Sequence, residues 1–290
     1  MLAVFALLTA PSFPLQDPPA EPPSQSAVLK APPGSSPGQP AGPAPDLDPG
    51  GGNGAAGMRA LSGLLPNGEV LHFGVEWRLI HAGNATLRWS GAPANNGARE
   101  VGLTLRSAGL VNALYKVNDV YSTMLEDAFC ATAVSIKAEE GRRRRDTKIT
   151  FDRTGGKAQY LERDLVKDEI VGAREIDVPP CVHDVIGALY RLRSMKLAPG
   201  QTVELPVSDG KKSVMARVEA QAREKVKTKA GVYQTVRYEA HLFNDILYRR
   251  KGRLYVWLTD DDLRVPVQIR ARLQFHIGTI TFQLEKQERS

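Results

Sequence analysis

Apolar and polar residues alternate with a period of two through most of the sequence after residue 68. The pattern is clearest at 265–275, and it recurs at 69–79, 85–89, 101–105 and 280–284. A period of two places one row of side chains on a buried face and the next on a wet face, as in a half-buried strand. About a dozen such runs, separated by turns rich in Gly and Asp, predict a mainly β fold. We expect an antiparallel curled sheet, an open barrel or a sandwich.

The first two runs are predicted to form a hairpin. In the run at 69–79, Leu79 continues the apolar face that begins at Leu71. The pair Gly83-Asn84 lies between this run and the next, and both residue types favour a tight hairpin turn. The sequence therefore predicts Leu79 on the buried face and the turn at Gly83-Asn84.

One segment has helical rather than strand spacing. Its apolar residues, three or four positions apart, are Val182, Val185, Ile186, Leu189, Leu192 and Met195. Pro179-Pro180 precedes this stripe and Pro199-Gly200 follows it, while Asp184 lies in the first turn, where a carboxylate suits the helix dipole. We predict one amphipathic helix at about residues 182–196 that covers or plugs one end of the sheet. Gly187 within it indicates close packing, because Gly weakens a helix.

The first 57 residues are not expected to join a core. Residues 1–10 are apolar and end in small side chains, which is typical of an export signal. Residues 11–57 contain 13 Pro and 8 Gly, which favours an extended, disordered tether. This tether carries −3 of the formal net charge of +6 and leaves +9 on the single β-rich domain expected at 58–290. Such a basic domain suits anionic partners, although a positive net charge is also found on solvated surfaces that bind no specific partner.

The chain contains two cysteines, Cys130 and Cys181. In an oxidising compartment the pair is a candidate disulfide, and closing a loop of about 50 residues would stabilise the folded state by roughly 4 kcal/mol. The alternative is two buried thiols that act as small apolar side chains. The sequence leaves both interpretations open.

The chemistry-bearing residues form no recognised catalytic or metal-binding pattern. The histidines are scattered, without the paired spacing of metal ligands: His72, His81, His183, His241 and His276. We therefore expect no metal site and no cofactor, and we assign no catalytic residue. Nucleic-acid-binding signatures are absent, and no apolar run is long enough to span a membrane.

A dense basic run, Arg142–Arg145, follows Glu139-Glu140-Gly141. Four consecutive Arg side chains could bind a phosphate through charge-assisted hydrogen bonds. The alternative, which we favour, is a solvated turn that leads into the strand at Lys148–Phe151.

Large side chains supply the candidates for a ligand cavity, namely Trp77, Trp89, Leu189, Tyr190 and Trp257. Such residues more often fill a β core, so both interpretations are kept. A catalytic site would be sought first at Glu76, Asp119, His183 and Asp184. Helix initiation explains the last two almost as well.

Four blocks of the sequence, in this order and spacing, resemble the domain of unknown function 3108 family of exported bacterial proteins. They lie at 68–87 (GEVLHFGVEWRLIHAGNATL), 183–212, 227–235 (KTKAGVYQT) and 254–284. The resemblance implies a secreted β-rich fold and no recognised enzyme activity. It carries over no catalytic residues, because none is established for the family.

We predict a periplasmic or cell-envelope binding protein for an apolar or amphipathic ligand. Its expected partner is a lipid or another anionic or amphipathic envelope component. Two alternatives come from other classes: a hydrolase of envelope polymers, and a structural scaffold without a ligand. A fold does not decide among them, because function resides in the site.

Overall fold

The computed structural model describes Leu61, Leu65 and residues 68–90, 98–274 and 277–289. The predicted export signal at 1–10 and the predicted tether at 11–57 lie outside the described residues, as does His276.

The described residues form fourteen strands, two α-helices and one short 3-10 helix. The first eight strands are β1 (Gly68–Trp77), β2 (Ile80–Ser90), β3 (Arg99–Ser107), β4 (Asn118–Leu125), β5 (Ala131–Glu140), β6 (Arg143–Asp152), β7 (Lys157–Asp164) and β8 (Glu169–Asp177). The remaining six are β9 (Thr202–Ser208), β10 (Ser213–Thr228), β11 (Gly231–Ala240), β12 (Gly252–Thr259), β13 (Pro266–Leu273) and β14 (Thr279–Arg289). The helices are α3 (Gly109–Leu114), η1 (Asp127–Phe129) and α4 (Val185–Arg193).

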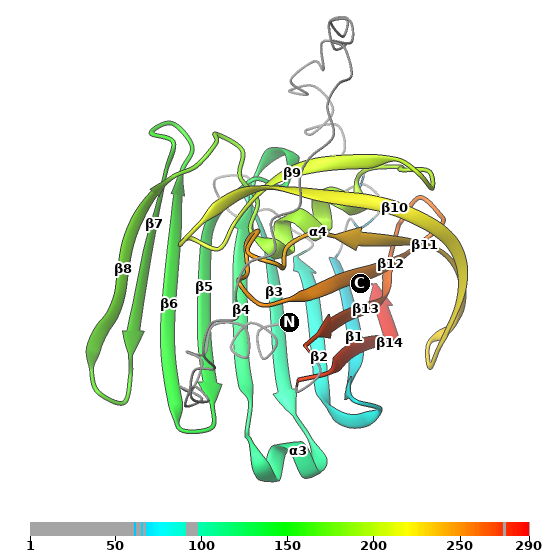
Figure 1. The fold of residues 1–290 in the computed structure, drawn as a ribbon, viewed down its shortest axis with the longest axis horizontal. Coiled ribbons are helices and arrows are strands. Elements are labelled where there is room, and N and C mark those ends of the chain that lie inside the picture. Colours follow the sequence, from blue (N-terminus) through cyan, green and yellow to red (C-terminus); the bar gives the residue numbers. More distant parts are fainter. Residues whose placement is uncertain (1–60, 62–64, 66–67, 91–97, 275–276, 290) are drawn as a thin grey trace, which may run out of the picture.

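All fourteen strands belong to one antiparallel sheet, in the order β8-β7-β6-β5-β4-β3-β2-β1-β14-β13-β12-β11-β10-β9. Each half of the chain is a meander, and the two halves join where β1 pairs with β14. β8 and β9 are the two edges, so the sheet curls without closing into a barrel (Figure 1). The prediction of a mainly β fold with an antiparallel curled sheet is confirmed.

The hairpin of β1 and β2 turns at a different place from the one predicted. Arg78 and Leu79 form the turn, with φ values of 49° and 70°, whereas Gly83 and Asn84 lie inside β2. Gly83 is needed for close packing, because a Cβ there would lie 2.2 Å from the carbonyl oxygen of Arg106. Leu79, predicted to be buried, is 92% exposed at the turn.

α4 is shorter than the predicted helix at about 182–196. It begins after Asp184, whose side chain accepts hydrogen bonds from the backbone N–H groups of Ile186 and Gly187, each at 3.0 Å. Its buried residues cover nearly every direction around the axis: Val185, Ile186, Gly187, Leu189, Tyr190, Leu192 and Arg193. A helix buried on most sides is enclosed by protein. α4 therefore plugs the curved sheet, with β9 and β10 passing over it (Figure 1).

α3 was not predicted. It connects β3 to β4 and none of its six residues is buried. A helix is recognised in a sequence by an apolar stripe that faces a core, and α3 faces no core.

One cluster of buried residues surrounds α4. Trp89 from β2 stacks on Tyr190 of α4, with ring centroids 4.9 Å apart, and Phe129 packs against both rings. Cys130 and Cys181 form a disulfide. Of the two interpretations that the sequence left open, the disulfide is the one confirmed, and it ties the β4–β5 connection to the segment before α4.

Candidate functional site

A cavity of about 390 Å³ lies between the inner face of the sheet and α4. Strands β3 to β8 form its floor, and the start of α4, the β9–β10 turn and Tyr248 form its roof. The lining residues are Leu103, Tyr121, Ile136, Ala138, Glu140, Arg143, Arg145, Thr147, Ile149, Tyr160, Glu162, Val171, Asp184, Val185, Ile186, Ser208, Asp209, Lys211 and Tyr248. The interior of the sheet is thus filled around Trp89 and hollow over β4 to β7.

The cavity is apolar at one end and charged at the other. Along β5 its lining runs from Ile136 to Glu140 at the β5–β6 turn. Along β6 it runs from Ile149 through Arg145 to Arg143, which is paired with Glu140 across the two strands. Both strands therefore pass from apolar side chains near α4 to charged side chains at the turn. An amphipathic molecule matches this gradient.

Arg145 is only partly satisfied at the charged end. Its Nη2 lies 3.1 Å from Oδ2 of Asp164, and its Nε lies 4.0 Å from Oε1 of Glu162. Its Nη1 is buried and has no hydrogen-bond partner within the described part of the chain. Lys211, from the β9–β10 turn, adds a second cation 3.7 Å from Glu162 and 4.6 Å from the ring centroid of Tyr160. The charged end thus offers an unused N–H donor.

Glu140 is the second incompletely paired group, and its Oε1 is buried without a partner among the described residues. Burial, followed by the negative charge of Asp119, raises the pKa of Glu140 to about 7. Burial also raises the pKa of Asp119 to about 6, against the hydrogen bond that its Oδ1 accepts from the backbone N–H of Glu139 at 3.0 Å. Near neutral pH the Glu140 carboxyl can therefore donate or accept a hydrogen bond.

Asp184 lines the cavity, but its oxygens are already used. Tyr121 donates its hydroxyl to Oδ2, and Thr123 donates to Oδ1 at 3.0 Å. The helix N–H groups of Ile186 and Gly187 complete four hydrogen bonds. Burial raises the pKa of Asp184, and these four donors oppose that shift. The arrangement fixes the start of α4 against β4.

None of the five predicted cavity residues lines this cavity. Trp89, Leu189 and Tyr190 are buried together in the core around α4. Trp77 donates to the carbonyl oxygen of Ile277 at 2.6 Å, from the lower end of β1. The Trp257 indole donates to Oε2 of Glu224 at 2.8 Å on the other half of the sheet. Trp89, Leu189 and Tyr190 thus lie together around α4, and Trp77 and Trp257 lie elsewhere. Contact of any of the five with a ligand stays a prediction.

Of the four residues considered for a catalytic site, Asp184 alone belongs to the cavity lining. Nδ1 of His183 donates to the carbonyl oxygen of Phe129 at 2.7 Å, and burial lowers the pKa of His183 to about 4. Asp119 sits on β4 beyond the lining, and Glu76 is on β1. The structure does not bring these four together around one space.

The residues that line the cavity were not predicted as a set. A partial signal was present, because Arg143 and Arg145 belong to the basic run Arg142–Arg145. Period two in β6 turns these two inward and Arg144 outward, and Arg142 lies in the β5–β6 turn; neither Arg142 nor Arg144 belongs to the cavity lining.

No group of three or more His, Cys, Asp or Glu side chains in the described ranges is placed to hold a metal ion. Neither α3 nor α4, the helices within the same ranges, has the length and apolar character needed to cross a bilayer.

The fold and the cavity define a class of protein in which an open antiparallel β-sheet wraps around one helix. The chain belongs to the family described as Protein of unknown function (DUF3108), whose family model matches residues 72–285. The family resemblance found in the sequence is therefore confirmed. A comparison with curated proteins gives no match.

Solved structures support the fold. The chain is similar to a β-barrel-like protein of domain of unknown function DUF1849 from Brucella abortus, with a TM-score of 0.51 and 8% identity over 78% of this chain and 98% of that one. It is more distantly similar to a Bacteroides fragilis protein inferred to be exported, with a YmcC-like fold (TM-score 0.31, 12% identity, 76% and 95% covered). A third likeness is to an inferred lipoprotein from Parabacteroides distasonis (TM-score 0.33, 9% identity, 77% and 96% covered). At such identities the likeness concerns the fold alone, and the last two TM-scores add nothing to it.

Proposed function

We propose that this protein is an envelope binding protein that holds one small amphipathic molecule with an anionic head. The observation that carries the proposal is the cavity, apolar beside α4 and charged at the β5–β6 turn, where Nη1 of Arg145 and Oε1 of Glu140 are buried without partners among the described residues. A carboxylate or phosphate oxygen is the acceptor that Arg145 lacks.

The energetics favour such a ligand. A buried donor without an acceptor costs about 1–3 kcal/mol, which a ligand oxygen at Nη1 of Arg145 would recover. Apolar walls at Ile136, Ile149 and Val185 favour a hydrocarbon tail through burial of its surface. The volume of about 390 Å³ is near the lower limit of ligand pockets, so the site suits one short chain rather than a two-chain lipid.

Location in the periplasm or elsewhere in the envelope is part of the same proposal. The disulfide between Cys130 and Cys181 supports it, because disulfides persist in oxidising compartments. The export signal at 1–10 and the tether at 11–57 remain proposals that fit this location. The hydrolase alternative has less support, since the hydrogen bonds of His183 and Asp184 serve the entry to α4.

The test is a titration of the full chain with dodecanoate, and with dodecanol as the uncharged analogue, followed by calorimetry. Ala138→Phe fills the cavity and should abolish binding of both compounds. Ala133→Phe, on the opposite face of the same strand, is the matched control and should bind like the wild type. Dodecanoate binding that is equal in the wild type and in Ala138→Phe would contradict the proposed site.

The anionic head is tested with Arg145→Gln. This variant should lose about tenfold or more in affinity for dodecanoate and little for dodecanol, because a charge-assisted hydrogen bond is removed. Arg144→Gln, which changes the next residue outside the cavity lining, should alter neither affinity. Native mass spectrometry of protein from its own host adds a direct readout, and a chain that carries no copurified amphiphile would count against the function.

A further inference from the structure

The four connections at one end of β1 to β8 form a continuous rim, which we define as residues 78–81, 109–116, 141–143 and 165–168. Backbone hydrogen bonds link these turns to their neighbours. Ala108 N–H donates to Ala82, Gly141 N–H to Lys116, and Leu165 N–H to Arg144, at 2.8–2.9 Å. The rim is therefore one surface at the lower end of the molecule in Figure 1, where α3 lies.

The rim gathers the exposed apolar side chains of the molecule. Seven of the thirteen large hydrophobic side chains that are exposed in the described residues belong to it, which is more than any other part of the surface holds. They are Leu79, Ile80, Leu110, Leu114, Tyr115, Leu165 and Val166. None of the thirteen lies in the described turns at the opposite end, 126–130, 153–156 and 178–184. Apolar residues gathered at one end mark an interaction site.

Leu79 is exposed and has a backbone conformation that leucine rarely adopts. Its φ of 70° and that of Arg78, 49°, are the left-handed values of a tight hairpin turn, which favours Asn-Gly. The neighbouring turns place Gly141 and Asp168 at their positive φ values, residue types that adopt them more readily. A leucine that is 92% exposed at a strained position stabilises neither the turn nor the core. Such an outlier indicates a role outside the fold.

α3 supports the same inference. A six-residue helix is too short to be stable by itself and normally depends on packing, yet α3 has no buried residue. Leu110 and Leu114 are four residues apart, so they share one side of the helix, and they are 64% and 77% exposed. The apolar side of α3 therefore faces outward beside the β1–β2 turn.

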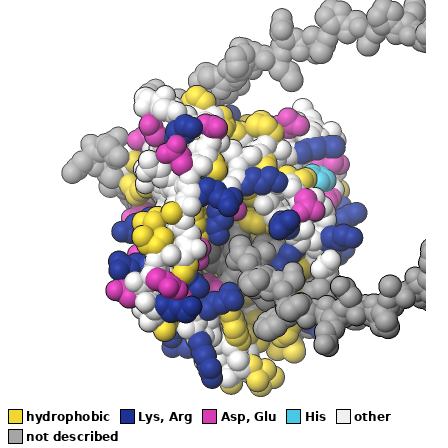
Figure 2. All heavy atoms as spheres, turned by 60° about the vertical axis from the view of Figure 1, so that its left-hand side comes forward, with side chains coloured by type: hydrophobic (Ala, Val, Ile, Leu, Met, Phe, Trp, Pro, Cys, Tyr) yellow, Lys and Arg dark blue, Asp and Glu magenta, His cyan; other side chains and the backbone are white. Residues whose placement is uncertain are grey.

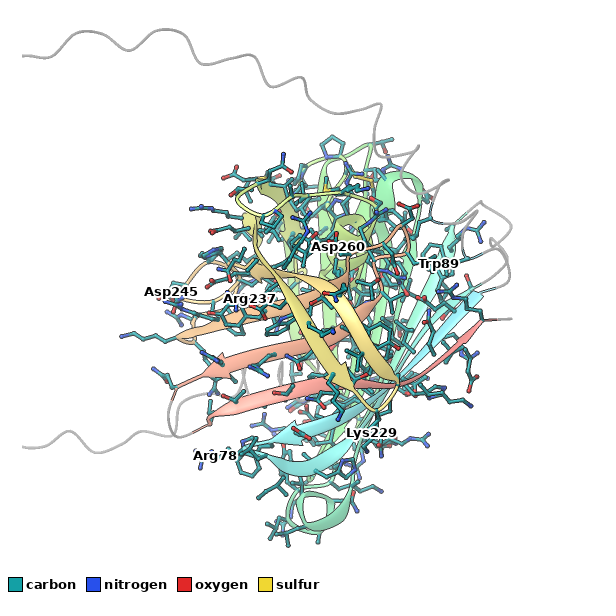
Figure 3. All side chains as sticks on the ribbon, turned by 90° about the vertical axis from the view of Figure 1, so that its right-hand side faces the viewer. Arg78, Trp89, Lys229, Arg237, Asp245 and Asp260 are labelled. Atoms are coloured by element: carbon teal, nitrogen blue, oxygen red, sulfur yellow. A yellow bond between two sulfur atoms is a disulfide. The ribbon has the colours of Figure 1, made fainter. Side chains whose placement is uncertain are left out.

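The charge of the rim selects the partner. It contains five basic residues and one acidic residue, Asp168, which pairs with Arg163 at 2.7 Å. Lys167 lies 3.4 Å from Glu169, and the other basic residues of the rim are Arg78, Lys116, Arg142 and Arg143. Figure 2 shows basic and hydrophobic side chains together at this end, and Figure 3 places Arg78 at the outer end of the β1–β2 hairpin.

We propose that this rim docks the protein on an anionic membrane surface, with Leu79, Leu110 and Leu114 entering the headgroup region and the basic side chains contacting lipid phosphates. Apolar residues flanked by Lys and Arg are the pattern of interfacial binding. A second copy of the chain is a poorer partner, because a two-fold contact through the rim would oppose like charges. The rim and the cavity are separate sites, although both reach the β5–β6 turn at Arg143.

The test is flotation of the full chain with vesicles of phosphatidylglycerol and phosphatidylcholine, compared with phosphatidylcholine alone. Binding should require phosphatidylglycerol and fall at least tenfold between 0.05 and 0.5 M salt, since exposed charges are screened. Leu79→Asn with Leu114→Ser should reduce binding by about tenfold or more through lost apolar burial. Lys116→Glu with Arg142→Glu should abolish it.

Leu79→Asn also separates docking from misfolding, because Asn tolerates the positive φ and the variant should be at least as thermally stable as the wild type. Val232→Ser, which changes a side chain 57% exposed on β11 away from the rim, should bind vesicles like the wild type.

Equal binding to both vesicle types, or full binding by the rim variants, would overturn the proposal. If sedimentation shows that the wild type is a dimer and that the rim variants are monomers, the rim is a self-association surface instead. Vesicle binding by Ala138→Phe should be unchanged, so failure of the cavity proposal and failure of this one are distinguishable.

Discussion

Glu140 shows how a single residue couples the cavity to pH. Its carboxyl has a pKa of about 7 in the folded protein and 4.5 as the reference value, mainly because of burial and then because of Asp119; Arg143 opposes the shift. Between these values the folded chain holds a proton that the unfolded chain has released. Stability from Glu140 is therefore fully present below pH 4.5 and is lost as the pH rises through 7.

Glu140→Gln is expected to remove that loss, because the amide stays neutral. The variant should exceed the wild type in free energy of unfolding at pH 8 by about 1–2 kcal/mol, after allowance for partial solvent access, and should match it at pH 4. Urea denaturation at both pH values measures the difference. Glu139→Gln, on the opposite face of β5, is the control and should not gain stability at pH 8, because it removes the partner of Arg144. A variant that is less stable than the wild type at pH 8 would show that the ionised carboxylate has a favourable partner.

Single residues also show what a sequence can and cannot predict. Close packing at Gly187 followed from a glycine inside a helix, and a Cβ there would lie 3.0 Å from both Leu125 and Phe129. The exposure of Leu79 did not follow, since alternation assigned it to the buried face. Alternation holds only while the chain continues as a strand, and the tight turn at Arg78-Leu79 ends it two residues early.

Among the elements, α4 is held in place by specific interactions at both ends. The disulfide between Cys130 and Cys181 and the cap at Asp184 hold its start. At its end, Arg193 makes a bidentate ion pair with Glu69 on β1, at 2.7 and 3.2 Å, and both side chains are completely buried. Gln287 on β14 donates a further hydrogen bond to Glu69 at 3.0 Å. This network joins the helix to the line where the two halves of the sheet meet.

Glu69→Ala should destabilise the protein by about 3–5 kcal/mol, because it leaves the Arg193 guanidinium buried without its counter-charge. Asp177→Ala removes the partner of Lys157 in an exposed pair and is the control, with a much smaller expected loss of stability. Chemical denaturation measures both. Similar losses in the two variants would mean that Arg193 finds solvent or another acceptor once Glu69 is gone.

The helix itself was predictable from its 3.6-residue spacing and its flanking prolines. The contacts that hold its two ends in place were only partly predictable. The two cysteines gave one candidate pair, so the disulfide could be named as an alternative. Arg193 and Glu69 are 124 residues apart and each looks like an ordinary surface charge in the sequence. Only the pairing of distant strands brings them together, and strand order cannot be read from period two.

For the whole molecule, the decisive feature is that the sheet is continuous across the pairing of β1 with β14. The first meander, β1 to β8, contains the floor of the cavity and the rim, and the second, β9 to β14, supplies part of the cavity roof. The fold class could be predicted because every strand has its own local pattern. The cavity could not, because its lining comes from residues between 103 and 248 whose neighbours are fixed by this topology.

The two meanders are expected to unfold together, because β1 and β14 pair over nine positions and α4 packs inside both. Trp89 reports on the first meander and Trp257 on the second, and both are buried. Variants that retain one of these residues, with the other tryptophans replaced by Phe, should each show a urea midpoint that coincides with loss of far-ultraviolet circular dichroism in the same variant. Phe282→Ala, on β14 opposite Val75 of β1, should lower both midpoints alike and should reduce the free energy of unfolding by about 3–5 kcal/mol. Separate transitions for the two reporters would show instead that each meander is an independent folding unit and that the β1–β14 pairing only docks them.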